Sequence, residues 1–173
     1  MPPVTSRFFS DLKRRWRLPS RSALPALLLT TTLVFAVVSS AKAEPTPGWK
    51  AFTTGDHKKA EAIWQPLAEQ GDYHAAFGMG VLSQTRDQFE DAAKWYEQAA
   101  RAGLTSAQVL LGSMYIDGRG VQRDAVRAYA WLHRATLDGH ANAAWARNAV
   151  GAVLTPNQLS QAEALSHTLK ARE

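Results

Sequence analysis

An internal repeat constrains the fold of this chain more than any other feature. Three glycines, Gly71, Gly103 and Gly139, stand 32 and 36 residues apart, and an alanine follows each of them by four positions. The residues eleven, eight, seven and four positions before each glycine are also alike, with small side chains alternating with aromatic or aliphatic ones. These offsets share one face of an α-helix. A repeat of this length predicts stacked helical units that bury their apolar faces against one another.

Each unit is predicted to be a pair of antiparallel helices. The glycine ends one helix in left-handed backbone geometry, and a second amphipathic segment starts after it. Asp124 is expected to cap a helix, and Thr155 with Gln158 has the pattern of a capping box. Gly80 and Gly112 occupy equivalent mid-helix positions, which predicts close approach of a neighbouring helix. The expected helices span 46–54, 57–70, 73–84, 88–102, 105–117, 124–138, 141–150 and 156–171.

Residues 71–140 resemble the Sel1-like repeats, relatives of the tetratricopeptide repeats (TPRs) with a longer loop inside the repeat. The resemblance implies an all-α fold, a short right-handed α-solenoid of antiparallel helix pairs. The chain then divides into a TPR-like first helix pair at 44–72, two Sel1-like repeats at 73–140 and C-terminal capping helices at 141–173. The residues that carry the resemblance are Ala107, Leu111, Gly112, Met114, Tyr115, Gly118, Gly120, Val121, Asp124, Ala128, Trp131, Ala135 and Gly139.

The basic character of the chain belongs to its N-terminal segment. The formal net charge is +5, but residues 1–43 hold seven cations and one anion, which leaves −1 for residues 44–173. An apolar run at 23–38 follows the cations, and small residues at Ala41 and Ala43 precede Glu44. This order is typical of a bacterial signal peptide cleaved between Ala43 and Glu44. We therefore expect a periplasmic or secreted protein without nucleic-acid binding. The alternative is an uncleaved helix that makes the protein an adaptor anchored in the inner membrane.

The resemblance implies that the first helix of each pair lines the concave side of the solenoid. Five apolar residues fall on the outward stripe of these helices, and they would form a groove for a protein or peptide partner. The alternative is that they pack on adjacent helices, because the solenoid is short. The five candidate partner-binding residues are Phe77, Val81, Val109, Ile116 and Trp145.

No catalytic or metal-binding constellation is recognisable. The chain has no cysteine, and its five histidines do not have the spacing of a zinc site. Gly118 and Gly120 lack the lysine of a phosphate-binding loop and belong to the turn between helices. No cofactor is expected, and the predicted function is an exported, non-catalytic scaffold. The alternative is a periplasmic enzyme acting on cell-wall or β-lactam substrates. The sequence names neither the partner nor the oligomeric state.

Overall fold

The computed structural model describes residues 46–169, and every regular element in this range is an α-helix. The predicted signal segment 1–43 and its cleavage site at Ala43 and Glu44 lie outside the described residues. All eight expected helices are present, and most boundaries differ by one or two residues from the prediction. The helices are α3 (Pro47–Thr53), α4 (His57–Glu69), α5 (Tyr73–Thr85), α6 (Phe89–Arg101), α7 (Thr105–Asp117), α8 (Ala125–Leu137), α9 (Ala143–Gly151) and α10 (Pro156–Thr168).

The repeat glycines end their helices in the same way. Gly71, Gly103 and Gly139 have φ values of 95°, 93° and 89°, in the left-handed region that favours glycine. After α6, the Gly103 amide donates to the Ala100 carbonyl at 3.0 Å, and the Leu104 amide donates to the Ala99 carbonyl at 3.1 Å. This pair of hydrogen bonds is the Schellman motif. The predicted left-handed caps are confirmed, and they turn the chain back on itself after each pair.

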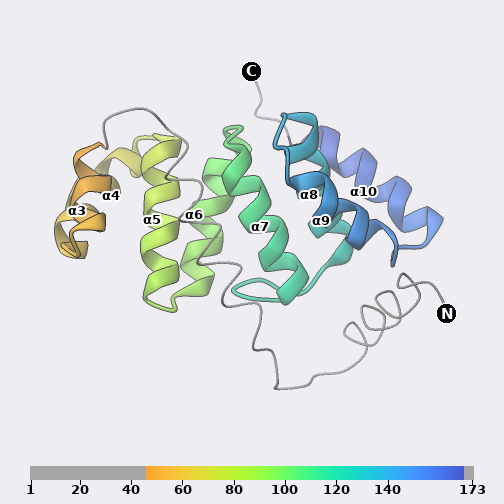
Figure 1. Ribbon diagram of the computed structural model, residues 1–173, viewed down its shortest axis with the longest axis horizontal. Helices are drawn as coiled ribbons and strands as arrows, with labels where there is room; N and C mark the ends of the chain where they lie inside the picture. Colours follow the sequence, from red (N-terminus) through yellow and green to blue (C-terminus); the bar gives the residue numbers. More distant parts are fainter. Residues whose placement is uncertain (1–45, 170–173) are drawn as a thin grey trace, which may run out of the picture.

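The helices stack in sequence order along the long axis of the molecule (Figure 1). α3 packs on α4, α4 on α5, α5 on α6, α6 on α7, α7 on α8 and α8 on α9. The last helix, α10, returns to pack on α8. We call α5, α7 and α9 the first-helix row, because each opens one of the pairs that follow the first pair, α3 and α4. Such stacking of neighbours is the arrangement of a solenoid.

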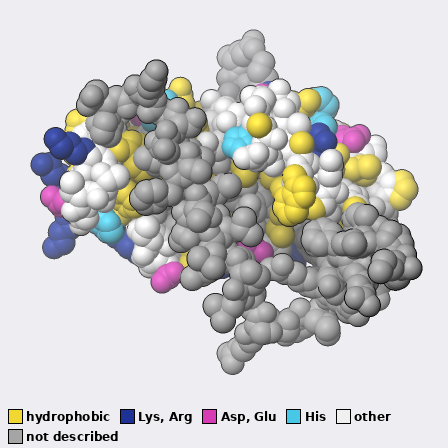
Figure 2. All heavy atoms as spheres, in the orientation of Figure 1, with side chains coloured by type: hydrophobic (Ala, Val, Ile, Leu, Met, Phe, Trp, Pro, Cys, Tyr) yellow, Lys and Arg dark blue, Asp and Glu magenta, His cyan; other side chains and the backbone are white. Residues whose placement is uncertain are grey.

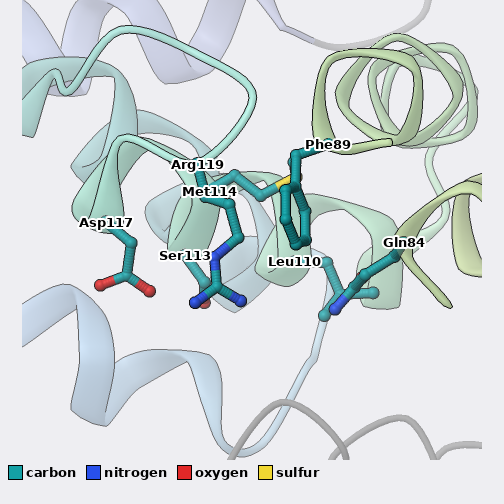
Figure 3. A pocket seen from close by; sticks show the side chains of 7 residues that line it. All are labelled: Gln84, Phe89, Leu110, Ser113, Met114, Asp117 and Arg119. Carbon is teal, nitrogen blue, oxygen red and sulfur yellow. The ribbon is translucent and has the colours of Figure 1, made fainter. Parts of the chain in front are cut away.

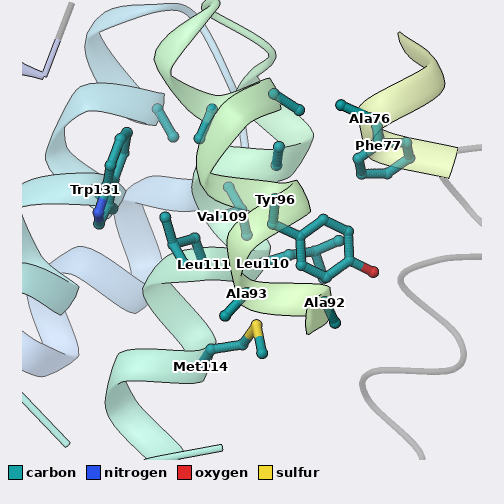
Figure 4. Packing of buried hydrophobic residues seen from close by; sticks show 14 of the residues in the cluster. Ala76, Phe77, Ala92, Ala93, Tyr96, Val109, Leu110, Leu111, Met114 and Trp131 are labelled. Atoms are coloured by element: carbon teal, nitrogen blue, oxygen red, sulfur yellow. The ribbon is translucent and has the colours of Figure 1, made fainter. Parts of the chain in front are cut away.

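The core runs between the stacked helices. Figure 4 shows Phe77 of α5, Tyr96 of α6, Leu111 of α7 and Trp131 of α8 contributing to one continuous apolar cluster. A side chain at Gly80 would meet the Tyr96 ring at 2.5 Å, and one at Gly112 would meet Leu132 at 2.9 Å. The close approach predicted at both mid-helix glycines is therefore confirmed, because only glycine leaves room for these side chains.

Side-chain caps fix the starts of several helices. The Asp124 carboxylate accepts a hydrogen bond from the Arg127 amide at 3.0 Å at the start of α8. At the start of α10, the Thr155 hydroxyl accepts from the Gln158 amide at 3.3 Å, and the Gln158 side chain accepts from the Thr155 amide at 3.0 Å. Both predicted caps are confirmed. Each satisfies backbone donors that a helix leaves unpaired at its first turn.

Candidate partner-binding surface

Three of the five predicted partner-binding residues belong to the core. Phe77, Val81 and Val109 are 6%, 2% and 7% exposed. The Phe77 ring lies 6.1 Å from the Trp49 ring and 5.7 Å from the Tyr96 ring, measured between centroids. Nine consecutive residues of α5, 75–83, are buried. The open groove expected at these three residues is therefore absent, because the middle of α5, from residue 75 to 83, is buried on every side of the helix. The alternative expectation, that these residues pack on adjacent helices, describes Phe77, Val81 and Val109.

The other two predicted residues differ from these and from each other. Ile116, near the end of α7, is half-buried and packs against the core cluster. Trp145, on α9, is 71% exposed, more than any other large hydrophobic residue of the described chain. Figure 2 shows hydrophobic side chains gathered at the surface over α9. An exposed tryptophan offers a large apolar surface of the kind that anchors protein interfaces.

A small cleft opens beside the C-terminal half of α7, and we call it the Arg119 cleft. Its enclosed part measures about 20 Å³, which is room for about one water molecule. The apolar walls come from α6 and α7, and polar groups stand at the rim (Figure 3). The cleft is lined by Gln84, Phe89, Leu110, Ser113, Met114, Asp117 and Arg119.

Arg119 is held over an aromatic ring. Its guanidinium carbon lies 5.0 Å from the centroid of the Phe89 ring, within the range of a cation–π contact. The backbone on both sides of Arg119 is left-handed, with φ of 69° at Gly118 and 71° at Gly120. A side chain at Gly120 would lie 2.1 Å from the Phe89 carbonyl oxygen. The loop is therefore seated directly on the start of α6, which fixes where Arg119 can reach.

Gln84 is oriented by a buried tyrosine. The Tyr96 hydroxyl donates a 2.7 Å hydrogen bond to the side-chain oxygen of Gln84. Tyr96 is fully buried, and this burial raises the pKa of its phenol far above the usual value, so that the hydroxyl keeps its proton. Since the oxygen of the Gln84 amide is engaged, its NH2 group is the part left to face the cleft.

Charged residues are distributed unequally between the helices. α5 has no Asp, Glu, Lys or Arg, α7 has only Asp117, and α9 has only Arg147. By contrast, the exposed face of α6 carries ion pairs at helical spacing, Lys94 with Asp91 at 2.9 Å and Arg101 with Glu97 at 2.7 Å. Such surface pairs each contribute well under 1 kcal/mol. The part of the first-helix row that reaches the surface, which is small on α5 and α7 and larger on α9, therefore carries few charges, Asp117 at the end of α7 and Arg147 on α9.

Two histidines, His133 and His167, lie close together between α8 and α10, near the C-terminal end of the described chain. His133 of α8 stacks on Tyr129, with centroids 5.6 Å apart, and lies 6.5 Å from the His167 ring of α10. Burial lowers the pKa of His133, and the positive charge of Arg147 adds to this effect, while Glu163 opposes it. Within residues 46–169, no three His, Asp or Glu side chains stand close enough together to hold a metal ion.

Neither Arg119 nor Gln84 was among the candidate site residues expected from the sequence. The segment from Gly118 to Gly120 was expected to form a turn between helices and nothing more. The signal that could have found Arg119 is its position between two glycines in a loop that must close tightly on its neighbour. The contact with Phe89 joins two repeats, so no pattern within one repeat contains it.

Comparison with known proteins supports the repeat assignment. A sequence model described as the Sel1 repeat matches residues 74–104 and 105–140. Among solved structures, the chain is similar to a protective antigen present in uropathogenic Escherichia coli strains, which displays an SLR fold. The two share 27% identity with a TM-score of 0.67, and the match covers 95% of this chain and 37% of that protein. The predicted all-α solenoid is confirmed. Among the described residues, no helix is long and apolar enough to cross a membrane.

Proposed function

Because this chain is a Sel1-like repeat protein, we propose that it acts as an exported, non-catalytic scaffold that binds a protein or peptide partner along its first-helix row. The observation that carries the proposal is the exposed Trp145 of α9, which lies in a row with few charges together with the half-buried Ile116 and the Arg119 cleft at the C-terminal end of α7. Stacked helix pairs supply a rigid, extended surface, and function depends on what this surface presents.

The binding surface that we propose differs from the groove expected from the sequence. Phe77, Val81 and Val109 support it from the core and do not contact the partner. The contacting residues that we propose are Trp145, Ile116 and the rim of the Arg119 cleft. A partner segment that packs on this row would bury the ring of Trp145, and such aromatic anchors dominate the energy of many interfaces.

Export is supported by the order of residues before the described helices. A cationic stretch, an apolar run at 23–38 and the small residues Ala41 and Ala43 precede the proposed cleavage between Ala43 and Glu44. N-terminal sequencing of the protein from its host tests this directly. A sequence starting at Glu44 is expected, and a chain that retains residues 23–38 would favour the membrane-anchored adaptor.

Partner binding is tested by one substitution with a matched control. Trp145→Ala removes the anchor, and Leu137→Ala removes another exposed apolar side chain, which is 51% exposed on α8. Both variants keep the core intact. We expect co-purification of a crosslinked partner to fall at least tenfold in Trp145→Ala and to stay at the wild-type level in Leu137→Ala. Equal recovery of the partner with both variants would remove the first-helix row as its binding surface.

The non-catalytic part of the proposal has its own measurement. The enzyme alternative requires acylation by a β-lactam or turnover of a cell-wall substrate. We expect no covalent labelling of the purified protein by a fluorescent penicillin. Stoichiometric labelling that is blocked by unlabelled penicillin would contradict a purely binding role.

A further inference from the structure

The last helix is attached to the stack through α8. Among the described helices, α10 packs mainly on α8, and the two lie side by side at the C-terminal end of the stack (Figure 1). Within α10 only Ala162 and Ser166 are buried, and the buried Leu169 follows it. Because the buried apolar area is small, little free energy holds α10 in place. A change at its contact with α8 can therefore release α10 without unfolding the rest of the molecule.

The contact between α8 and α10 contains two histidine rings. His133 of α8 stacks on Tyr129, with the ring planes 12° apart, and the His167 ring of α10 meets it edge to face at 6.5 Å. The Nδ1 atom of His133 is buried and has no hydrogen-bond partner among the described residues. A protonated imidazole carries an N–H on both nitrogens. Protonation of His133 in the docked state therefore buries an unpaired donor, which costs free energy.

The groups around His133 come from all three helices at this end of the molecule. Burial lowers the pKa of His133, and most of the surrounding charges act in the same direction because they are positive. Glu163 of α10 opposes them, and its carboxylate accepts a hydrogen bond from the Tyr129 hydroxyl at 3.5 Å. The groups that face His133 are Tyr129 and Arg134 on α8, Arg147 on α9, and Glu163 and His167 on α10.

Movement of α10 away from α8 relieves these costs together. It separates the His133 ring from the His167 ring, and it admits water to the contact, so that a protonated His133 can be hydrated. The docked state therefore binds fewer protons than the released state as the pH falls through about 6.5. Docking is favoured above this pH and weakens below it.

We propose that protonation of His133 releases α10 from α8, so that the last helix is an acid-sensitive cap on the stack. Release uncovers the α8 surface around Tyr129, which is 7% exposed while α10 is docked. The helices from α3 to α8 share the continuous core and stay folded. This inference goes beyond the proposed function, and the release requires neither a partner nor export.

The test uses the absence of cysteine from the chain. Ala162→Cys places a thiol at a position of α10 that is 0% exposed, where it reacts only when α10 is released. Ala164→Cys, at an exposed position of the same helix, gives the rate of an accessible thiol at each pH. Ala99→Cys, at a position of α6 that is 0% exposed, reports opening of the whole stack. The purified proteins are labelled with a pyridyl disulfide between pH 7.5 and pH 5.

We expect the labelling rate at position 162, relative to that at position 164, to rise at least about fivefold between pH 7.5 and pH 5. The relative rate at position 99 should change less than about twofold. His133→Phe keeps an aromatic ring on Tyr129 without a titratable group, and it should remove the rise at position 162. Glu163→Gln removes the opposing anion, and it should shift the release to higher pH.

Three results would overturn the proposal. They are no rise at position 162, the same rise in His133→Phe, or a parallel rise at position 99, which indicates acid unfolding of the whole molecule. Amide hydrogen exchange of residues 156–168, corrected for the intrinsic effect of pH on exchange, repeats the comparison without a substitution in α10. Protection should fall at pH 5 in the wild type but not in His133→Phe, and protection retained at pH 5 in the wild type would contradict release.

Discussion

At the scale of single residues, the loop between α7 and α8 contains the position at which a side chain is least tolerated. Gly120 combines left-handed backbone, with φ of 71°, and direct contact with the Phe89 carbonyl. Gly139 has the same kind of backbone, with φ of 89°, but open space around it. The two positions therefore separate the cost of backbone conformation from the cost of a steric clash.

Gly139→Ala should destabilise the protein by about 1–2 kcal/mol, the cost of placing a side chain in left-handed backbone. Gly120→Ala adds a clash with fixed backbone, so its cost should reach about 3 kcal/mol or more. Urea unfolding of the two variants measures the difference. Equal losses of unfolding free energy would mean that the loop moves away from α6 without penalty.

His133 makes stability depend on pH. Burial lowers its pKa below the usual value of about 6.5, with Arg147, His167 and Arg134 acting in the same direction and Glu163 against them. The folded protein then binds fewer protons than the unfolded chain as the pH falls through about 6.5. Stability contributed by neutral His133 is present above this pH and decreases below it.

We expect the melting temperature to fall between pH 7.5 and pH 5, and to fall less steeply in His133→Gln. Leu137→Ala, which changes an exposed residue of the same helix and removes no titratable group, serves as the control and should keep the wild-type slope. Thermal melts over this pH range check both expectations. An unchanged slope in His133→Gln would show that other groups control the acid response.

Residue-level patterns predicted the caps correctly, but they left open whether Phe77, Val81 and Val109 face a partner or pack on adjacent helices, and the structure shows the packing. The turn glycines, Asp124 and Thr155 act within one or two turns of the chain, so local sequence contains their geometry. By contrast, Phe77 was assigned to an outward stripe, and it lies instead between Trp49 and Tyr96. Trp49 comes from α3, outside the repeat, so periodicity alone could not place it.

At the scale of helices, α5 and α6 show why the pattern of polar and apolar residues predicts the solvent-facing side of α6 but not that of α5. α6 has a clear charged face, which predicts its orientation correctly. The middle of α5 has no polar face, and residues 75–83 are all buried, whereas its ends are exposed at Tyr73, His74 and Thr85. A helical segment that is hydrophobic all round is buried on every side. Its sequence therefore does not distinguish a partner-facing stripe from a core-facing one.

The last helix depends on its cap and on α8. α10 packs on α8, burying Ala162 and Ser166, and its capping box ties Thr155 to Gln158. Most of the other α10 side chains are exposed. Since the apolar area that it buries is small, the cap is a considerable part of what fixes its first turn.

Thr155→Ala should cost about 1 kcal/mol, because the Gln158 amide loses its acceptor. Ser160→Ala, at an exposed position inside the same helix, should change stability little or increase it slightly. Amide hydrogen exchange of residues 156–168 in the two variants gives the measurement. If protection in α10 is the same in both, the helix is held by its packing on α8 alone.

At the scale of the whole molecule, the contacts between helices stabilise the fold, and we propose that separate, exposed residues bind the partner. Each helix packs mainly on its neighbours in sequence, and the charged faces of α4 and α6 lie in solvent. With no cysteine in the chain, these helix contacts hold the fold without disulfides. The C-terminal end of α7 and the exposed face of α9, with Trp145, are left as the surface on which we propose that a partner acts.

The central claim is that this row binds the partner, and site-specific photo-crosslinking in the host cell tests it most directly. A photoreactive residue replaces Ser113, on α7 at the Arg119 cleft, or Lys94, on α6, whose side chain is 76% exposed. We predict one discrete adduct from position 113 and none from position 94. The adduct from position 113 should disappear when Trp145→Ala is introduced into the same protein. Adducts of the same size and yield from both positions, or only from position 94, would contradict the claim.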